Sequence, residues 1–288
     1  MKIFKTKTEL SLWRKTLLNE SVGFVPTMGA LHAGHLSLIQ ASKKECQKTI
    51  VSIFVNKLQF GPDEDFNTYP RFIDQDIKLL TNEKVDALFF PEEEEMCSED
   101  LSFEINETKI ANELEGKTRP KFFSGVCLIV LKLFNIVQPE YAYFGEKDIQ
   151  QLFIIRKMIK DFNLPIKLNS CPTVREKNGL AMSSRNKYLS SAEKGQATIL
   201  YQALKKGAEL ILNKMNLASN SKEHIDNLIS AIHTIISETN YNIQIDYVDI
   251  RDLHTFKKIS AFDNQPMIIV GAIYYKKIRL IDNIIVNP

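Results

Sequence analysis

Two histidines three positions apart are the strongest chemical signal in the sequence. His32 and His35 lie in the segment PTMGALHAGH, which follows a short β-rich run and precedes a helical stretch. At such a strand-to-helix junction, the first backbone N–H groups of the helix and the positive end of its dipole favour an anion. Gly29 and Gly34 allow the backbone to approach that anion closely. We predict a phosphate site in which both imidazoles donate hydrogen bonds as negative charge builds on a leaving pyrophosphate.

The same histidines also fit a plainer interpretation, as metal ligands or as packed polar residues. For a single histidine, that interpretation would be the better one. The HAGH spacing at a strand-to-helix turn favours the phosphate site, because anions are commonly bound where a helix begins.

A second polar segment, MSSR at residues 182–185, offers further donors suited to phosphate oxygens. Ser183 and Ser184 can each donate a hydrogen bond, and the planar guanidinium of Arg185 can make a bidentate contact. Taken alone, the segment could equally be a surface loop before a helix. Neither motif comes with a Ser/His/Asp or Cys/His arrangement that would identify a covalent nucleophile.

The elements that position these motifs follow from the alternation of short β-rich runs with helical stretches. This alternation predicts an α/β fold, a Rossmann-like doubly wound parallel sheet covered by helices on both faces. The nearly all-apolar runs at 50–55 and 87–90 suit strands buried on both faces. We expect strands at 22–27, 49–55, 86–91, 141–145 and 166–174, and helices at 35–48, 73–84, 108–115, 126–137 and 148–162.

The pattern changes beyond residue 173. Two helical stretches, 192–215 and 222–238, come before three β-rich runs at 243–251, 266–275 and 276–286. Helices grouped before strands predict a smaller C-terminal α+β domain. We therefore expect one domain at 1–173 and a second at 174–288, between which the segment 176–185 could act as a hinge.

Composition excludes several classes of protein. Of the 288 residues, 44% are hydrophobic and 25% are charged, as in ordinary globular proteins. The net charge of +2 provides no long-range field that would attract nucleic acid. The four cysteines lie far apart without a CxxC pair, so we expect reduced thiols in a cytoplasmic protein. The apolar stretch 125–137 is too short to span a membrane and is expected to be a buried helix.

Several segments together resemble a known family. HAGH followed by MSSR is similar to the motif pair of the nucleotidyltransferase group that includes class I aminoacyl-tRNA synthetases. Within that group, the chain resembles the pantothenate synthetase family. That narrower match spans residues 23 to about 190 and rests on VSIFVNKLQF, DFNTYPR, LEGKTRP, FNIVQPEYAYFGEKDIQQL and PTVREKNGLAMSSRNKYLS.

The resemblance implies an ATP-dependent ligase on the route to coenzyme A. Such an enzyme condenses pantoate with β-alanine to pantothenate through a pantoyl adenylate, releasing AMP and pyrophosphate. The expected small molecules are therefore ATP with Mg²⁺, pantoate and β-alanine, with no nucleic acid and no membrane as partners. Residues 1–173 would bind ATP and pantoate and join two subunits in a homodimer, and residues 174–288 would form a lid.

Site residues carried over by position complete the expected active site. The resemblance implies that Gln59 and Gln151 hold the hydroxyl and carboxylate groups of pantoate, which uncharged amides can orient without neutralising. Lys147 is implied to contact the ATP phosphates and Asp148 the ribose. Charge would be offset by His32, His35, Lys147, Ser183, Ser184 and Arg185. Asn56, Tyr69 and Arg119 are implied on the pantoate side, and Met28, Gly34, Gly145, Val174 and Met182 are implied contacts for the nucleotide or for pantoate.

The sequence departs from the family pattern at three places. Lys57 stands where a proline usually follows the asparagine of the NKLQF loop, which leaves that loop less rigid. Phe122 and Phe123 follow Lys121 where a histidine usually precedes the phenylalanine, and EMCS at 95–98 replaces the common EMYP. None of the three removes a residue assigned to phosphate or pantoate.

Other functions stay open on the residues alone. A nucleotidyltransferase acting on a phosphorylated substrate would need a basic pocket where this chain offers Gln59 and Gln151. A tRNA synthetase would need a longer, more basic C-terminal part. A catalytically silent nucleotide- or RNA-binding module would keep the phosphate loop without the two amides.

Overall fold

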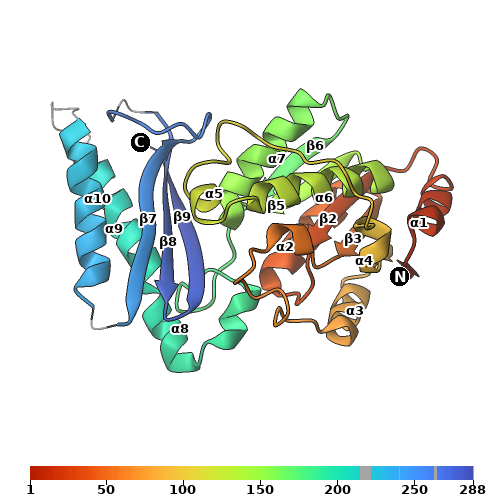
Figure 1. Ribbon diagram of the computed structural model, residues 1–288, viewed down its shortest axis with the longest axis horizontal. Helices are drawn as coiled ribbons and strands as arrows, with labels where there is room; N and C mark the ends of the chain where they lie inside the picture. Colours follow the sequence, from red (N-terminus) through yellow and green to blue (C-terminus); the bar gives the residue numbers. More distant parts are fainter. Residues whose placement is uncertain (215–221, 240, 263–264, 288) are drawn as a thin grey trace. The chain divides into compact units, whose positions relative to one another are not determined.

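The computed structural model describes residues 1–214, 222–239, 241–262 and 265–287 (Figure 1). The chain divides into two compact units. The first unit consists of Met1–Glu146 and Gln150–Val174, and the second consists of Lys147–Ile149 and Arg175–Pro288. Among the described residues, no helix has both the length and the apolar character needed to cross a membrane.

A six-stranded parallel sheet forms the centre of the first unit. Its strand order is β1-β4-β3-β2-β5-β6. The central strands are buried because their runs are almost wholly apolar. The strands are β1 (Lys2–Phe4), β2 (Val22–Thr27), β3 (Lys48–Ile53), β4 (Ala87–Phe89), β5 (Tyr141–Gly145) and β6 (Lys167–Cys171).

Helices pack on both faces of this sheet, as two successive residues of β2 show. Phe24 meets Phe134 of α6, with ring centroids 6.4 Å apart. Its neighbour Val25 joins Leu38 and Ile39 of α2 in another core cluster. Successive strand residues point to opposite faces, so α2 and α6 cover opposite faces. The helices are α1 (Lys7–Arg14), α2 (Ala33–Glu45), α3 (Ile73–Asn82), α4 (Glu93–Met96), α5 (Glu115–Thr118), α6 (Phe122–Val137) and α7 (Ile149–Asp161), with single turns η1 (Lys57–Gln59) and η2 (Glu146–Asp148).

The predicted doubly wound α/β fold is confirmed by this topology. From β2 the chain moves outward through β3 and β4, and it then returns to place β5 on the other side of β2. The carboxyl ends of β2 and β5 therefore flank the point where the strand order reverses, which is where doubly wound folds bind ligands. The predicted buried helix at 125–137 is also confirmed, as part of α6.

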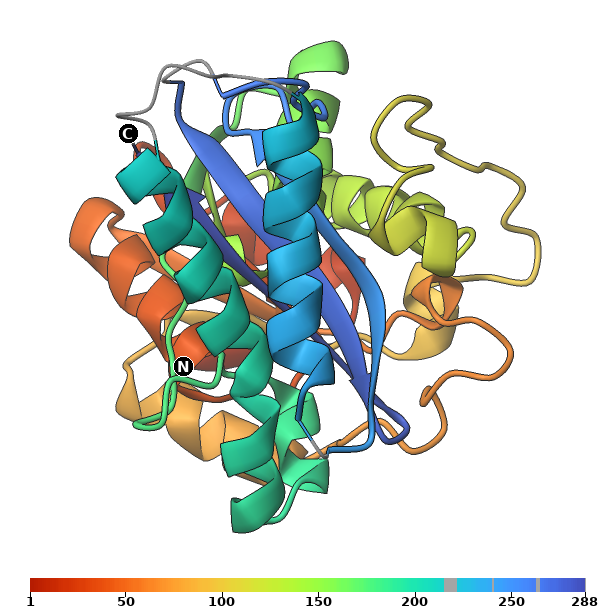
Figure 2. The same cartoon turned by 90° about the vertical axis from the view of Figure 1, so that its left-hand side faces the viewer.

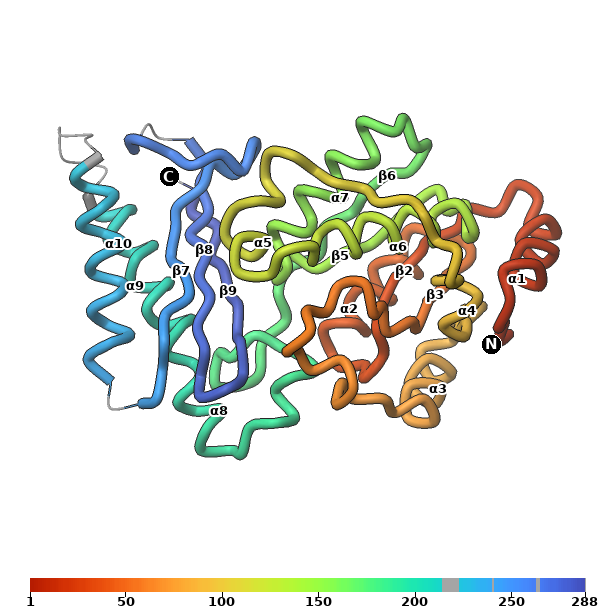
Figure 3. Tube along the Cα trace, in the orientation of Figure 1, coloured from red at the N-terminus to blue at the C-terminus, as the bar shows by residue number. Residues whose placement is uncertain are grey.

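The helix predicted at 108–115 is wrong. Figure 3 shows an irregular path between α4 and α5, and helix begins only at Glu115. In this segment, hydrogen bonds with side chains replace the backbone hydrogen bonds that a helix would make. The Glu107 carboxylate accepts three backbone N–H groups from residues 109–111. The Gln150 amide accepts the N–H of Glu115 and donates to the carbonyls of Ile110 and Glu113. Such local bonds compete with helix formation.

The N-terminal elements β1 and α1 were not predicted from the sequence, although one signal for α1 was visible. Thr6 and Glu9 form a capping box in which each side chain accepts the backbone N–H of the other at 3.2 Å. A Thr-x-x-Glu pair before a helical stretch marks a helix start.

The second unit contains a three-stranded antiparallel sheet in the order β7-β8-β9. Figure 2 shows α9 and α10 side by side across one face of this sheet. Their apolar faces form one core with the strands, including Leu204, Ile232 and Ile269. The elements are η3 (Ser184–Tyr188), α8 (Ser191–Ala197), α9 (Ile199–Lys214), α10 (Lys222–Ser237), β7 (Ile243–Asp252), β8 (Met267–Tyr275) and β9 (Ile278–Val286).

The predicted α+β character of this region is confirmed, but the single helix expected at 192–215 is wrong. It is divided at Thr198, whose hydroxyl donates to the carbonyl of Gly195 at 2.6 Å where α8 ends. The predicted end of that helix at Met215 lies outside the described residues.

Candidate active site

The HAGH segment forms the turn that joins β2 to α2. His32 caps α2, and its Nδ1 accepts the Gly34 N–H at 3.1 Å. His35 Nδ1 accepts the His32 N–H at 3.3 Å, and the two rings lie 4.1 Å apart between centroids. A neutral imidazole carries its proton on the nitrogen that does not accept. These contacts therefore assign the proton to Nε2 in both rings, which makes each Nε2–H a donor.

Side chains also hold the turn that precedes the histidines. The Gly29 N–H donates to Thr27 Oγ1 at 3.1 Å. The N–H groups of Ala30 and Leu31 both donate to the Asp76 carboxylate at 2.8 Å. Sequence reasoning missed Asp76, for which the only available signal was an acidic residue in the first turn of a predicted helix. The N–H groups of residues 29–31 are thus all bound within the protein.

Three predicted residues meet at η1. Asn56 is 1% exposed, and its Nδ2 donates to Gln59 Oε1 and to the Gly125 carbonyl, both at 3.0 Å. Its Oδ1 accepts the Leu58 N–H at 3.1 Å. Gln59 Nε2 lies 3.1 Å from the sulfur of Met28. The structure therefore brings Met28, Asn56 and Gln59 together, and Asn56 fixes the direction of the Gln59 amide.

Gly125 lets α6 approach η1 closely enough for that contact. A Cβ at Gly125 would lie 2.3 Å from the Leu58 carbonyl oxygen and 2.8 Å from the Gln59 nitrogen. We expect Gly125→Ala to lower the free energy of unfolding by about 1–3 kcal/mol, since backbone would have to move. Urea denaturation measures the change. The control Gly195→Ala adds a Cβ in open space within α8 and should raise stability by about 0.5–1 kcal/mol. Equal stability of Gly125→Ala and wild type would contradict this steric argument.

Arg119 lies at the centre of a polar network beside Gln59. Its guanidinium bonds both carboxylate oxygens of Glu64, at 2.7 and 2.5 Å, and Glu115 at 2.9 Å. It also donates to the backbone carbonyl of Gln59 at 3.2 Å and packs 3.8 Å over the Phe122 ring. Neither glutamate was identified from the sequence. A direct contact between Arg119 and substrate stays a prediction.

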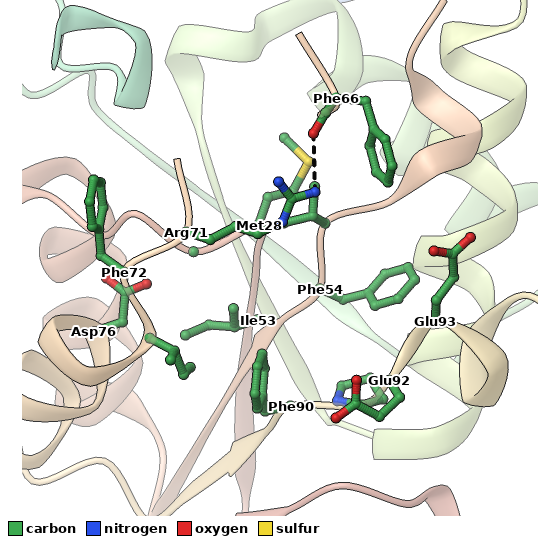
Figure 4. A pocket seen from close by; sticks show the side chains of 14 residues that line it. Met28, Ile53, Phe54, Phe66, Arg71, Phe72, Asp76, Phe90, Glu92 and Glu93 are labelled. Carbon is green, nitrogen blue, oxygen red and sulfur yellow. Dashed lines mark hydrogen bonds between the residues drawn. The ribbon is translucent and has the colours of Figure 1, made fainter. Parts of the chain in front are cut away.

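A cavity of about 350 Å³ lies beside the turn, at the carboxyl ends of β3 and β4. Figure 4 shows the Arg71 guanidinium donating to the Phe66 carbonyl at 3.0 Å, with Met28 beside it. Of the residues predicted for the site, Met28 and Gly29 line this cavity. Tyr69 packs instead on Phe60, with ring centroids 5.7 Å apart. Most of the other lining side chains are apolar, namely Ile53, Phe54, Val55, Phe72, Ile73, Phe90 and Pro91.

Four residues of the predicted site lie at the carboxyl end of β5 or shortly after it in the sequence, namely Gly145, Lys147, Asp148 and Gln151. A Cβ at Gly145 would meet no atom within 4 Å, so the backbone there borders open space. Gln151 lies half-buried in the first turn of α7, whereas its neighbour Gln150 is buried and structural. Lys147 and Asp148 belong to the second unit and form an ion pair at 3.7 Å. Asn283 holds the Lys147 backbone carbonyl at 3.0 Å.

The MSSR segment also belongs to the second unit. Ser183 caps η3, and its Oγ accepts the Arg185 N–H at 3.3 Å. Ser184 is buried, and Met182 and Arg185 are half-buried. Asn186 anchors the segment by donating to the Ala181 carbonyl at 3.0 Å. Val174, half-buried, is the last residue of the first unit.

The four cysteines are free thiols, as predicted. Burial raises the pKa of each of them, that of Cys127 to about 12. Only the thiolate is a strong nucleophile. Protonated thiols at neutral pH support chemistry without a cysteine-bound intermediate.

Known proteins resemble this chain over its full length. A family model described as pantoate-beta-alanine ligase matches residues 2–285. The chain is 44% identical to the pantothenate synthetase of Thermotoga petrophila over 289 aligned positions, which cover all of both chains. It is 48% identical to the pantothenate synthetase of Carboxydothermus hydrogenoformans over 268 aligned positions, which cover 92% of this chain and 91% of that one.

Solved structures of pantothenate synthetases also resemble this chain over nearly its full length. The pantothenate synthetase of Thermus thermophilus is 39% identical, with a TM-score of 0.89 over all of both chains. The pantoate-beta-alanine ligase of Francisella tularensis, solved in complex with beta-gamma ATP and beta-alanine, is 37% identical. Its TM-score is 0.79, and the match covers 99% of this chain and 97% of that one.

Proposed function

Because the chain belongs to the pantoate-beta-alanine ligase family, we propose that it joins pantoate to β-alanine in two steps driven by ATP. In the first step, a pantoate carboxylate oxygen attacks the α-phosphorus of ATP, and the bond to pyrophosphate breaks. In the second step, the β-alanine amine attacks the acyl carbon of pantoyl adenylate, and AMP leaves. The amine loses a proton as the amide forms. No covalent bond to the protein is needed.

The single observation that carries this proposal is the pair of Nε2–H donors on His32 and His35. Their Nδ1 atoms are occupied by backbone N–H groups, so both rings present a proton at the other nitrogen. Fixed donors are most useful where negative charge develops, here on the phosphate oxygens during loss of pyrophosphate. The pair lies where α2 begins, and the helix dipole adds to the same effect.

On the pantoate side, the geometry supports orientation of the acid by neutral amides. Asn56 holds the Gln59 amide, so the group is preorganised before substrate arrives. An amide leaves the pantoate carboxylate negatively charged and therefore nucleophilic, whereas a cation would lower its reactivity. We assign Gln151 the same kind of role, with Tyr69 and Arg119 shaping that side of the site.

The remaining assignments concern ATP. We propose that Lys147, Ser183, Ser184 and Arg185 bind its phosphates and that Asp148 binds the ribose. Met28, Gly34, Gly145, Val174 and Met182 would supply backbone or apolar contacts to the nucleotide or to pantoate. The ligands of the Francisella tularensis complex support ATP and β-alanine as substrates here.

Mg²⁺ fits this chain as a companion of ATP. Within the part of the chain that the structure describes, no group of three or more His, Cys, Asp or Glu side chains could hold a metal ion. Mg²⁺ in phosphoryl-transfer sites is held largely by substrate phosphates and water, with few protein ligands. When bound, it would offset phosphate charge. We also propose a homodimer joined through the first unit, which sedimentation velocity would show as a particle of twice the chain mass.

The decisive experiment is pyrophosphate exchange into ATP, with Mg²⁺ present and pantoate either added or omitted. We expect exchange only with pantoate, and formation of pantothenate and AMP when β-alanine is added. Exchange with another acid but not with pantoate would mean that the other acid is the substrate. ATP binding without any exchange would favour a silent nucleotide-binding module.

A further inference from the structure

We infer that Asp76 is a positioning residue for the histidine pair, because it holds the turn at 29–31 in the conformation that orients His32 and His35. This inference rests on the proposed function, in which those two rings donate to the phosphates. Asp76 acts through the turn and not by contact with the reacting atoms.

Burial and hydrogen bonding show how closely Asp76 is joined to the turn. The residue is 2% exposed, and its two carboxylate oxygens accept the N–H groups of Ala30 and Leu31, each at 2.8 Å. Bonds from N–H groups to an ionised carboxylate are stronger than neutral ones. Asp76 lies in α3, whereas the turn follows β2, so these bonds tie together segments about 45 positions apart.

The turn needs such support because its backbone is strained. Gly29 has φ +79° and Ala30 has φ +51°. The left-handed region is unfavourable for a residue with a Cβ, such as Ala30, because the Cβ lies too close to the following carbonyl oxygen. Ala30 is fully buried, and a Cβ at Gly29 would lie 3.1 Å from Asp76 Oδ2. The carboxylate therefore both bonds the turn and packs against it.

A short chain of contacts leads from Asp76 to the rings. Leu31, bonded by Asp76, directly precedes His32. The His32 N–H donates to His35 Nδ1, and the His32 ring accepts from Gly34. If the turn relaxed, the His32 N–H would move and His35 would lose the bond that fixes its proton on Nε2. We expect both the orientation and the tautomer of the histidines to depend on Asp76.

The test compares Asp76→Asn with Asp74→Asn. An asparagine in place of Asp76 offers one oxygen and one N–H₂ group to two N–H donors, so one bond is lost and a repulsive contact appears. Asp74 is exposed in the same first turn of α3, so its replacement removes the same charge without touching the turn. In pantoate-dependent pyrophosphate exchange we expect kcat to fall about 100-fold in Asp76→Asn. Asp74→Asn should match wild type.

Two further readouts separate positioning from general loss of structure. In a background that lacks both rings, His32→Ala with His35→Ala, Asp76→Asn should reduce the remaining kcat by less than about threefold, because effects that act through the same residues are not additive. The full 100-fold loss in that background would overturn the inference, as would wild-type kcat in the single variant. If Asp76→Asn does not fold, Thr27→Val removes the acceptor of the Gly29 N–H and should lower kcat at least about tenfold. Wild-type kcat in Thr27→Val would then overturn the inference.

An NMR measurement keeps this inference distinct from the proposed function. Long-range ¹H–¹⁵N spectra of the imidazoles report which ring nitrogen carries the proton. We expect Nε2–H signals for His32 and His35 in wild type and in Asp74→Asn, and changed signals in Asp76→Asn. Unchanged signals would overturn the positioning role even if the enzyme is active. Changed signals without exchange in wild type would support the positioning role and count against the proposed function alone.

Discussion

Replacement of His35 by alanine should lower pantoate-dependent pyrophosphate exchange by about 100- to 1000-fold, the usual loss for one preorganised donor to developing negative charge. The variant loses the Nε2–H that we assign to the phosphates. It also loses Nδ1, which accepts the His32 N–H at 3.3 Å, so His32 should become less ordered. Measurement of kcat and of KM for ATP and for pantoate should place most of the loss in kcat, since the donor acts mainly in the transition state.

His35→Asn is the matched control for that loss. The asparagine Oδ1 can take the place of Nδ1 and accept the His32 N–H, but the side chain is too short to replace the Nε2–H donor. We expect His35→Asn to recover thermal stability relative to His35→Ala while exchange stays low. Recovery of exchange in His35→Asn would mean that His35 acts by holding the turn and not by donating to phosphate.

Much of the first unit could be predicted from the sequence because local patterns decide it. The strand predicted from the run VGFVPT is β2, and its bounds are the predicted ones, 22–27. Apolar residues that favour β-structure, placed between polar segments, are typical of a buried strand. The segment 108–115 could not be predicted in the same way. Its helical pattern is overridden by Gln150, a side chain about 40 positions later in the sequence that bonds its backbone at three points.

In the candidate site, too, only the residues that belong to a local sequence pattern could be predicted. The glycine and histidine types at 29–35 identify the turn, because few other functions need that spacing at a strand end. Asp76 gave no such signal, although it holds the turn. Its importance comes from the pairing of α3 with the loop after β2, which depends on tertiary structure. Glu64 and Glu115 were missed for the same reason, since only the folded chain brings them to Arg119.

Replacement of Arg119 by methionine should lower the free energy of unfolding by about 3 kcal/mol or more. The Arg119 side chain is 11% exposed, and its partners Glu64 and Glu115 are 25% and 8% exposed. Removal of one partner from a buried ion pair leaves the other charge uncompensated, which is the main source of the loss. Urea denaturation followed by circular dichroism measures it. The exposed Arg156, which also packs over a phenylalanine ring, is the control, and Arg156→Met should change stability by less than about 0.5 kcal/mol.

Two additional variants identify the cause of that loss. Arg119→Lys keeps the charge but not the fork that binds both Glu64 oxygens, so its stability should lie between wild type and Arg119→Met. Adding Glu115→Gln to Arg119→Met removes the uncompensated carboxylate and should restore part of the stability. A double variant less stable than Arg119→Met would show that packing, and not buried charge, dominates. Because Arg119 also bonds the Gln59 carbonyl, the KM for pantoate should rise in Arg119→Lys. An unchanged KM would mean that the network around Arg119 does not contribute to pantoate binding.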